Sequence, residues 1–219
     1  MNKRLLLTSQ GLPDELKDTF ISLLTKSPSD YKVAFITTAA LDRGDENPSW
    51  LEYYRKELRE FGIIDIEDID LRKFNKQTLR EKLQNKDIIY VNGGNTYYLI
   101  KYVKENGFGE LLPKLLDQDK LYVGVSAGSV IMGPDISLAS WTPNDEDVNQ
   151  SYVNNSKGLS IVPFAIWPHF IESDEIVIQE KTKEVSYPVI ALTNQQAVLW
   201  KNNIYTVVGN KAERIYGNI

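Results

Sequence analysis

Short apolar runs alternate with longer amphipathic stretches over roughly the first 135 residues of the chain. The apolar runs are rich in β-branched and aromatic residues, which is typical of buried strands. They fall at residues 5–8, 32–37, 87–92 and 121–125. Stretches with apolar positions at helical spacing lie between them, at residues 13–25, 49–61 and 75–83. Strands that alternate with helices in this way predict an α/β fold whose parallel sheet is covered on both faces.

The pattern changes after this region. Residues 137–158 are rich in Ser, Asn and Asp with weak periodicity, which predicts a long surface excursion. Extended segments are expected at residues 158–162 and 164–167, and a helix at residues 173–186. The C-terminal end is β-rich, with strands expected at residues 189–192, 197–200, 204–208 and 213–216. We expect one domain that spans residues 1–219.

Composition excludes several classes of function. The chain has 25 Lys and Arg against 30 Asp and Glu, with the signs interspersed, so no basic stripe predicts a nucleic-acid partner. It has no cysteine, which excludes disulfides, thiolate metal sites and a cysteine nucleophile. The N-terminal apolar run is too short for a signal peptide or a membrane span. We therefore expect a cytoplasmic protein without a membrane partner.

A strand that turns sharply into a helix around a serine is the first feature that suggests chemistry. Residues 124–128 read Gly-Val-Ser-Ala-Gly and follow the apolar strand at 121–125. This is the pattern of a nucleophile elbow, in which the small flanking residues leave room for a tight turn that exposes the Ser126 hydroxyl. A helix that begins behind Ser126 would direct backbone N–H groups toward an oxyanion. An ordinary strand-to-helix turn fits the same pattern, so the motif needs support.

A second loop, Gly93-Gly94-Asn95-Thr96, follows the strand at residues 87–92. Because ligands bind beyond the carboxyl ends of parallel strands, this loop and Ser126 are expected on one edge of the sheet. The N–H groups of Gly94 and Ala127 would then form an oxyanion hole. Asn95 or Thr96 could instead be a plain helix N-cap. Phosphate binding is the weaker alternative, because the loop has no Walker lysine and no three-glycine fingerprint.

His169 is the only histidine in the chain, so it is the only candidate for an imidazole base. A lone histidine between Pro168 and Phe170 is more often a structural residue than a base. A Ser–His pair also needs an acid that orients the imidazole. Several acidic residues are near enough in sequence, and the pattern does not choose among them: Asp135, Asp145, Glu146, Asp147 and Glu172.

These motifs, taken in order, resemble the family of serine peptidases that contains aspartyl dipeptidase (dipeptidase E) and cyanophycinase. The resemblance covers most of the chain. It is carried by residues 35–40, 93–96, 124–128, 142–145 (Thr-Pro-Asn-Asp), 168–170 (Pro-His-Phe) and the β-rich end. It implies a flavodoxin-like, class I glutamine-amidotransferase-like three-layer sandwich with a mostly parallel sheet.

The resemblance also implies roles for individual residues. Ser126 would be the nucleophile, His169 the base and Asp145 the third member of a triad, with the oxyanion hole at Gly94 and Ala127. Asn95, Thr96 and Trp141 are candidate substrate contacts. The substrate would be a small peptide, with no cofactor and no metal, and the protein a monomer or homodimer.

The family's aspartyl specificity is not carried over to this chain, because no arginine occurs between Ser129 and Asp145. Two other functions remain open. An esterase of the α/β-hydrolase type shares the elbow and the Ser, Asp, His order, although His169 follows Ser126 closely for that fold. A non-catalytic module that binds an anion or small molecule at the glycine loop is the second alternative.

Overall fold

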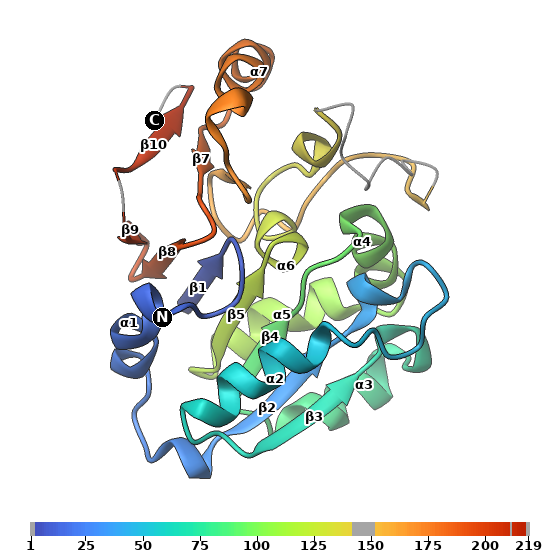
Figure 1. Cartoon of the computed structure of the whole chain (residues 1–219). Coiled ribbons are helices and arrows are strands. Elements are labelled where there is room, and N and C mark those ends of the chain that lie inside the picture. The colour runs from blue at the N-terminus through green and yellow to red at the C-terminus, as the bar shows by residue number, and fades with distance from the viewer. Residues whose placement is uncertain (1–2, 142–151, 211, 218–219) are drawn as a thin grey trace.

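A seven-stranded mixed sheet forms the centre of the protein in the computed structural model, which describes residues 3–141, 152–210 and 212–217 (Figure 1). The strand order is β3-β2-β4-β5-β1-β8-β9, and the first five of these strands run parallel. The strands are β1 (Arg4–Thr8), β2 (Lys32–Ile36), β3 (Asp65–Ile69), β4 (Ile88–Val91), β5 (Leu121–Val125), β8 (Gln196–Lys201) and β9 (Ile204–Gly209). β8 pairs antiparallel with β1 and with β9.

Helices cover both faces of this sheet. They are α1 (Lys17–Ser22), α2 (Leu51–Glu60), α3 (Lys76–Gln84), α4 (Thr96–Glu105), α5 (Phe108–Leu116) and α6 (Ala127–Val130). The helix α7 (Glu175–Lys181) lies away from this sheet (Figure 1). Apolar residues of α1 and α2 pack on one face, and those of α3, α4, α5 and α6 pack on the other. Successive strand residues alternate between the two packed faces, as Leu5 and Leu6 do. The expected three-layer α/β fold is therefore confirmed.

The β-rich end divides between two sheets. β8 and β9 extend the main sheet, whereas β7 (Val189–Ala191) lies in a separate sheet of order β10-β7-β6, with β6 (Ala165–Trp167) and β10 (Arg214–Tyr216). β6 and β7 run parallel, and β10 is antiparallel to β7. The chain therefore leaves β6 and β7 side by side and in the same direction, at one edge of this small sheet.

Two elements differ from the sequence expectation. Residues 158–162 form no strand, because their N–H groups bond to the backbone of residues 131–134, as Leu159 N–H does with the Ile131 carbonyl at 2.8 Å. The helix expected at 173–186 is confined to α7 and short 3₁₀ turns on either side, Glu172–Asp174 and Thr182–Glu184. No helix within the described residues is both long and apolar enough to cross a bilayer.

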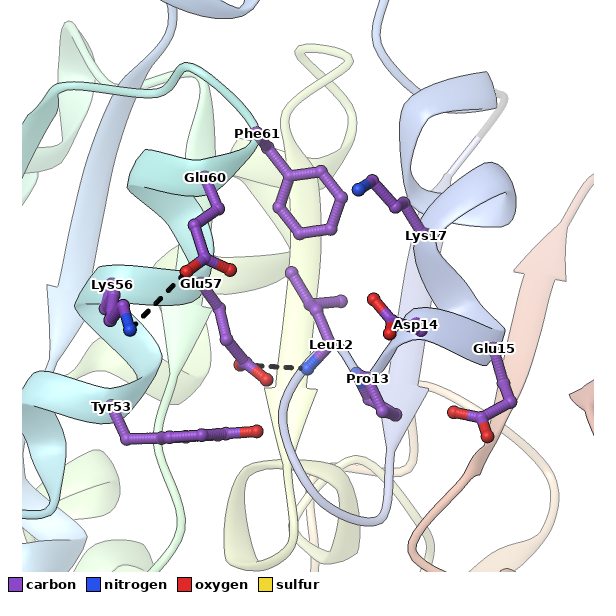
Figure 2. Close-up of a pocket in the computed structure, with 10 residues that line it drawn as sticks. All are labelled: Leu12, Pro13, Asp14, Glu15, Lys17, Tyr53, Lys56, Glu57, Glu60 and Phe61. Carbon is purple, nitrogen blue, oxygen red and sulfur yellow. Dashed lines mark hydrogen bonds and ion pairs between the residues drawn. The ribbon is translucent and has the colours of Figure 1, made fainter.

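A cavity of about 410 Å³ lies between α2 and the loop that follows β1 (Figure 2). The Glu57 side chain enters this region from α2, and its Oε2 accepts a hydrogen bond from the Leu12 N–H at 3.0 Å. Glu57 is only 8% exposed, and burial raises its pKa above the ordinary 4.5, although hydrogen bonds from Leu12 and Tyr53 act in the opposite direction. An ionised Glu57 therefore destabilises the folded state.

We expect the substitution Glu57→Gln to change how stability depends on pH. The folded protein holds the Glu57 proton more tightly than the unfolded chain does. Wild type should therefore lose stability relative to Glu57→Gln as the pH rises from below 4.5 through the raised pKa. The glutamine keeps an oxygen that can accept from Leu12. Urea unfolding of both proteins at acid and at alkaline pH measures the difference, and a gap that is constant with pH would contradict it.

Candidate active site

Loops from three neighbouring strands meet at the carboxyl edge of the main sheet. Val91 of β4 pairs with Gly124 of β5, and Thr8 of β1 pairs with Val125. The residues that follow, Gly93 and Ser126, are therefore in close contact, and a Cβ on Gly93 would lie 3.1 Å from the Ser126 Cβ. The expectation that the glycine loop and the serine turn share one edge is confirmed.

Ser126 has a strained backbone conformation. Its φ is +48° and its ψ is −110°, a region that residues with a side chain rarely adopt and that costs about 1–3 kcal/mol. The surroundings hold it there, because the Ser126 N–H donates to the Thr8 carbonyl at 3.1 Å and its carbonyl accepts from Ser129 N–H at 2.8 Å. The turn from β5 into α6 thus presents the Ser126 side chain at the sheet edge.

The glycines beside Ser126 are required by close backbone approaches. A Cβ on Gly128 would lie 2.2 Å from the carbonyl oxygen of Val91, and one on Gly124 would lie 2.6 Å from the Gly128 carbonyl oxygen. The buried Tyr122 hydroxyl also donates to this Gly128 carbonyl at 2.6 Å. These contacts leave no space for larger side chains at either position.

His169 faces Ser126 from the loop after β6. Its Nε2 lies 3.0 Å from the Ser126 Oγ, which is hydrogen-bonding distance. The backbone of His169 also has a positive φ, +57°. Its N–H donates to the Ser9 Oγ at 2.7 Å, and the next residue, Phe170, donates its N–H to the Leu192 carbonyl at 2.9 Å. The two residues that sequence reasoning paired as nucleophile and base are therefore in contact.

The other ring nitrogen of His169 contacts an amide. Its Nδ1 lies 2.7 Å from the Oδ1 of Asn194, a residue in the tight turn between β7 and β8. The turn is closed by the Gln196 N–H, which donates to the Thr193 carbonyl at 3.0 Å. Asp145, the residue that the resemblance implies for this position, lies outside the described residues, as do Glu146 and Asp147.

Gly94 lies on the opposite side of Ser126 from β1, in the loop between β4 and α4. Its φ is +125°, and a Cβ there would lie 2.2 Å from the Ala39 carbonyl oxygen, so only glycine fits. Asn95 is the N-cap of α4, because its side chain accepts from the Tyr98 N–H at 2.9 Å. Asn95 thus has the capping role that was the structural alternative, and it also lines the cavity beside Ser126. Thr96, the other candidate substrate contact in this loop, is buried, with only 2% of the residue exposed.

A cavity of about 350 Å³ lies in front of Ser126 and His169. Its other walls come from the glycine loop and from the segment after β2. The lining residues outside the glycine loop and the Ser–His pair are Ala40, Asp42, Arg43 and Trp50. Trp141 is not among the residues that line this cavity; its ring packs 5.9 Å from that of Trp167, just before Pro168 and His169.

Sequence reasoning missed Ser9, Asn194 and the segment with Asp42, Arg43 and Trp50. A signal for Ser9 was present, since Thr8-Ser9 is a polar pair directly after an apolar strand. Residues 38–48 form a polar stretch directly after the buried strand at 32–37, which is the position from which substrate-binding residues come in such sheets. Nothing in the sequence pattern indicated Asn194, because its approach depends on the pairing of β6 with β7.

Comparisons with known proteins agree with the geometry. The model of "Peptidase family S51" matches residues 5–208. An uncharacterized peptidase from Listeria monocytogenes is 30% identical over 206 residues, which cover 90% of this chain and 93% of the relative. Peptidase E from a Nostoc species is 27% identical, with 78% of this chain and 66% of the relative covered.

A solved structure of a candidate peptidase E from Listeria monocytogenes is similar along almost the whole chain. It superposes with a TM-score of 0.76 at 27% identity, and the match covers 96% of this chain and 100% of that one. The match of the family model extends over far more than half of the sequence and includes all the strands that carry the Ser126 and His169 loops. The chain is therefore a member of peptidase family S51.

Proposed function

We propose that this protein is a serine peptidase that hydrolyses a small peptide or a related amide, with Ser126 as the nucleophile and His169 as the base. One observation carries the proposal: the Nε2 of His169 lies 3.0 Å from the Oγ of Ser126, a serine held at φ +48° on the open edge of the sheet. Nucleophile and base within hydrogen-bonding reach, on a strained turn, are the arrangement that covalent acyl transfer needs.

The reaction follows from this geometry. Ser126 Oγ attacks the carbonyl carbon while its proton moves to His169 Nε2. The C–N bond then breaks, and the same proton passes from Nε2 to the leaving amine. A water molecule gives a proton to Nε2 and attacks the acyl group. When the bond to Oγ breaks, the acid is released and the proton returns to Ser126.

The negative charge on the tetrahedral intermediate needs donors that are already in place. The N–H groups of Gly94 and Ala127 are the proposed pair, because these residues flank Ser126 and Gly94 has no side chain between its backbone and the cavity. Asn194 is the proposed positioning residue for His169, in the role that the resemblance gave to Asp145. An amide oxygen at 2.7 Å from Nδ1 can hold the imidazole orientation, as the asparagine of papain-like proteases does.

The cavity favours a small polar substrate. Its volume of about 350 Å³ is near the lower end of the range for ligand pockets, roughly 300–1,000 Å³. Asp42 and Arg43 place opposite charges on its wall, which suits a peptide that carries both an ammonium and a carboxylate group. Arg43 comes from the segment after β2, whereas the resemblance led us to look for arginines after Ser129.

A fluorophosphonate probe tests the proposal without knowledge of the substrate. We expect the probe to label the wild-type protein at one site, Ser126, because only an activated serine reacts at a useful rate. Peptide mapping by mass spectrometry locates the adduct. His169→Gln should fold as wild type does, by circular dichroism, and should lose the labelling.

Substrate panels then separate the enzyme classes. A library of dipeptides that includes N-terminal aspartyl and isoaspartyl members, assayed beside simple esters, should give amide hydrolysis that depends on Ser126. Absence of labelling at Ser126 would favour the non-catalytic binding module. Labelling together with turnover of esters alone would favour the esterase.

A further inference from the structure

We propose that Ser9 is a positioning residue that fixes the proton of His169 on Nδ1, by making Asn194 present its oxygen to the ring. The inference rests on the proposed function, because the tautomer matters for catalysis only if His169 is the base. Ser9 is not one of the residues proposed above as nucleophile, base or positioning residue.

The Ser9 hydroxyl contacts both His169 and Asn194. Ser9 is fully buried, and its Oγ accepts a hydrogen bond from the His169 N–H at 2.7 Å. The same Oγ lies 3.4 Å from the Oδ1 of Asn194, at the long end of hydrogen-bonding distance. This Oδ1 is also the atom 2.7 Å from His169 Nδ1. One hydroxyl thus touches both the backbone of the base and the amide that faces its ring.

A hydroxyl has one hydrogen to donate. Because the His169 N–H already occupies an acceptor site on Ser9 Oγ, the hydroxyl hydrogen must go elsewhere. Within the described part of the chain, the acceptor in reach is Asn194 Oδ1. If the Asn194 amide turned over, an NH₂ group would replace that oxygen, and a buried hydroxyl hydrogen would be left without an acceptor. Leaving such a donor unsatisfied costs about 1–3 kcal/mol, which favours the orientation with oxygen toward the ring.

The amide orientation decides the tautomer. An oxygen at 2.7 Å from Nδ1 can only accept, so Nδ1 must carry the proton. Nε2 of the neutral ring is then a bare acceptor, 3.0 Å from Ser126 Oγ, and can take its proton. The turned amide would favour a proton on Nε2, where it would face the nucleophile and block base catalysis. A carboxylate has two acceptor oxygens, so its orientation does not affect the tautomer. An asparagine has one oxygen and one NH₂ group, so its orientation must be fixed.

Backbone hydrogen bonds hold Ser9 in place beside His169 and Asn194. The Ser9 N–H donates at 3.2 Å to the carbonyl of Gln196, the first residue of β8 after the turn that carries Asn194. The residue before it, Thr8, accepts the Ser126 N–H at 3.1 Å. The end of β1 therefore connects the nucleophile turn, the base loop and the Asn194 turn, and a change at Ser9 acts through His169 and Asn194.

Nitrogen-15 NMR tests the proposal directly, because His169 is the only histidine and labelled histidine gives the signals of one ring. At a pH where the ring is neutral, wild type and Ser126→Ala should both show a proton on Nδ1 and a bare Nε2. Ser9→Ala should lose this preference and give a substantial Nε2-protonated population. Its labelling by the fluorophosphonate probe should fall about tenfold or more, short of the ~10⁴-fold loss that follows a wrong tautomer in a Ser-His-Asp protease.

A second substitution that restores the Nδ1 proton can distinguish an effect of Ser9 on the Asn194 orientation from a packing defect. In the double variant Ser9→Ala, Asn194→Asp, the carboxylate accepts from Nδ1 whichever way it turns, so the Nδ1 proton and most of the labelling should return. The acid limb of the labelling rate should also move to higher pH, because a carboxylate stabilises the imidazolium. A purely structural defect at Ser9 would not be repaired by a change at Asn194.

The outcomes are distinguishable from failure of the proposed function. If wild type shows the Nδ1 proton and Ser9→Ala loses it while no protein reacts with the probe, the tautomer inference holds and the peptidase assignment fails. Retention of the wild-type tautomer in Ser9→Ala, or an Nε2 proton in wild type, would overturn the inference. If Ser9→Ala does not fold, two other measurements can still reject the proposal. One is a wild-type ring without a proton on Nδ1. The other is an Asn194→Ala variant in which the Nδ1 proton is unchanged.

Discussion

Replacement of Ser126 by alanine is expected to reduce amide hydrolysis by about 10⁶-fold, the loss seen when a serine protease is deprived of its nucleophile. The oxyanion donors and the cavity remain in this variant, so substrate binding should persist. Steady-state turnover of the best dipeptide, with the fluorophosphonate probe as a second measure, gives the result. Residual turnover within about tenfold of wild type would reject Ser126 as the nucleophile.

Substitutions at Ser126 can also be compared by their effect on the free energy of unfolding, which does not depend on activity. Alanine at residue 126 keeps the strain of φ +48° and ψ −110°, because it still has a Cβ. Glycine removes most of this strain, against an entropic cost of about 0.5–1 kcal/mol for its freer unfolded chain. We expect Ser126→Gly to be as inactive as Ser126→Ala and more stable by about 1 kcal/mol. Equal or lower stability would mean that the strain at residue 126 is no larger than the entropic cost of glycine.

The part of the site that the sequence predicted lies on the parallel strands. Apolar runs located β4 and β5, and glycines directly after a run indicated where the backbone turns and approaches its neighbours. Since every parallel strand ends at one edge, Gly94 and Ser126 could be placed together without knowledge of the strand order. Local patterns were sufficient because each of these residues directly follows its own strand.

Asn194 could not be predicted in this way. It follows β7, and the sequence placed that strand in a β-rich end without saying which sheet it joins. In the structure β7 runs parallel to β6, so the chain leaves both strands in the same direction and Asn194 arrives beside His169. This pairing joins residues more than 20 positions apart and leaves no trace in hydrophobic periodicity. The search for an acid also directed attention to carboxylates alone, while the ring contacts an amide.

Ser9 illustrates a different limit. A small polar residue at the end of a buried strand is common, and its role here depends on two partners far away in the sequence, His169 and Asn194. Hydrogen bonds between side chains on separate loops carry no periodic signal. The turn at Ser126 is therefore largely local in sequence, whereas the orientation of His169 is a property of the folded chain.

Substitution of Gly128 by alanine is expected to cost about 3 kcal/mol or more of stability. The new Cβ would lie 2.2 Å from the carbonyl oxygen of Val91, and both atoms are bonded directly to the backbone, so no side-chain rotation can separate them. Val91 ends β4, an inner strand of the sheet, and Gly128 lies in α6, which is anchored by the Tyr122 hydroxyl. Relief of the clash must therefore separate the elbow from the sheet. Urea unfolding monitored by tryptophan fluorescence measures the loss.

Gly109→Ala is the matched control. Gly109 lies in α5, and its added Cβ would meet the end of the Leu159 side chain at 3.0 Å, which a rotation of that side chain can relieve. Alanine is also about 1 kcal/mol more favourable than glycine within a helix, so the net change should be within about 1 kcal/mol of zero. Gly128→Ala should in addition lower labelling of Ser126 by about 10²-fold, since a shift of 1 Å at a catalytic group has that effect. Equal stability and labelling of the two variants would show that close packing of α6 on β4 is not what holds the nucleophile.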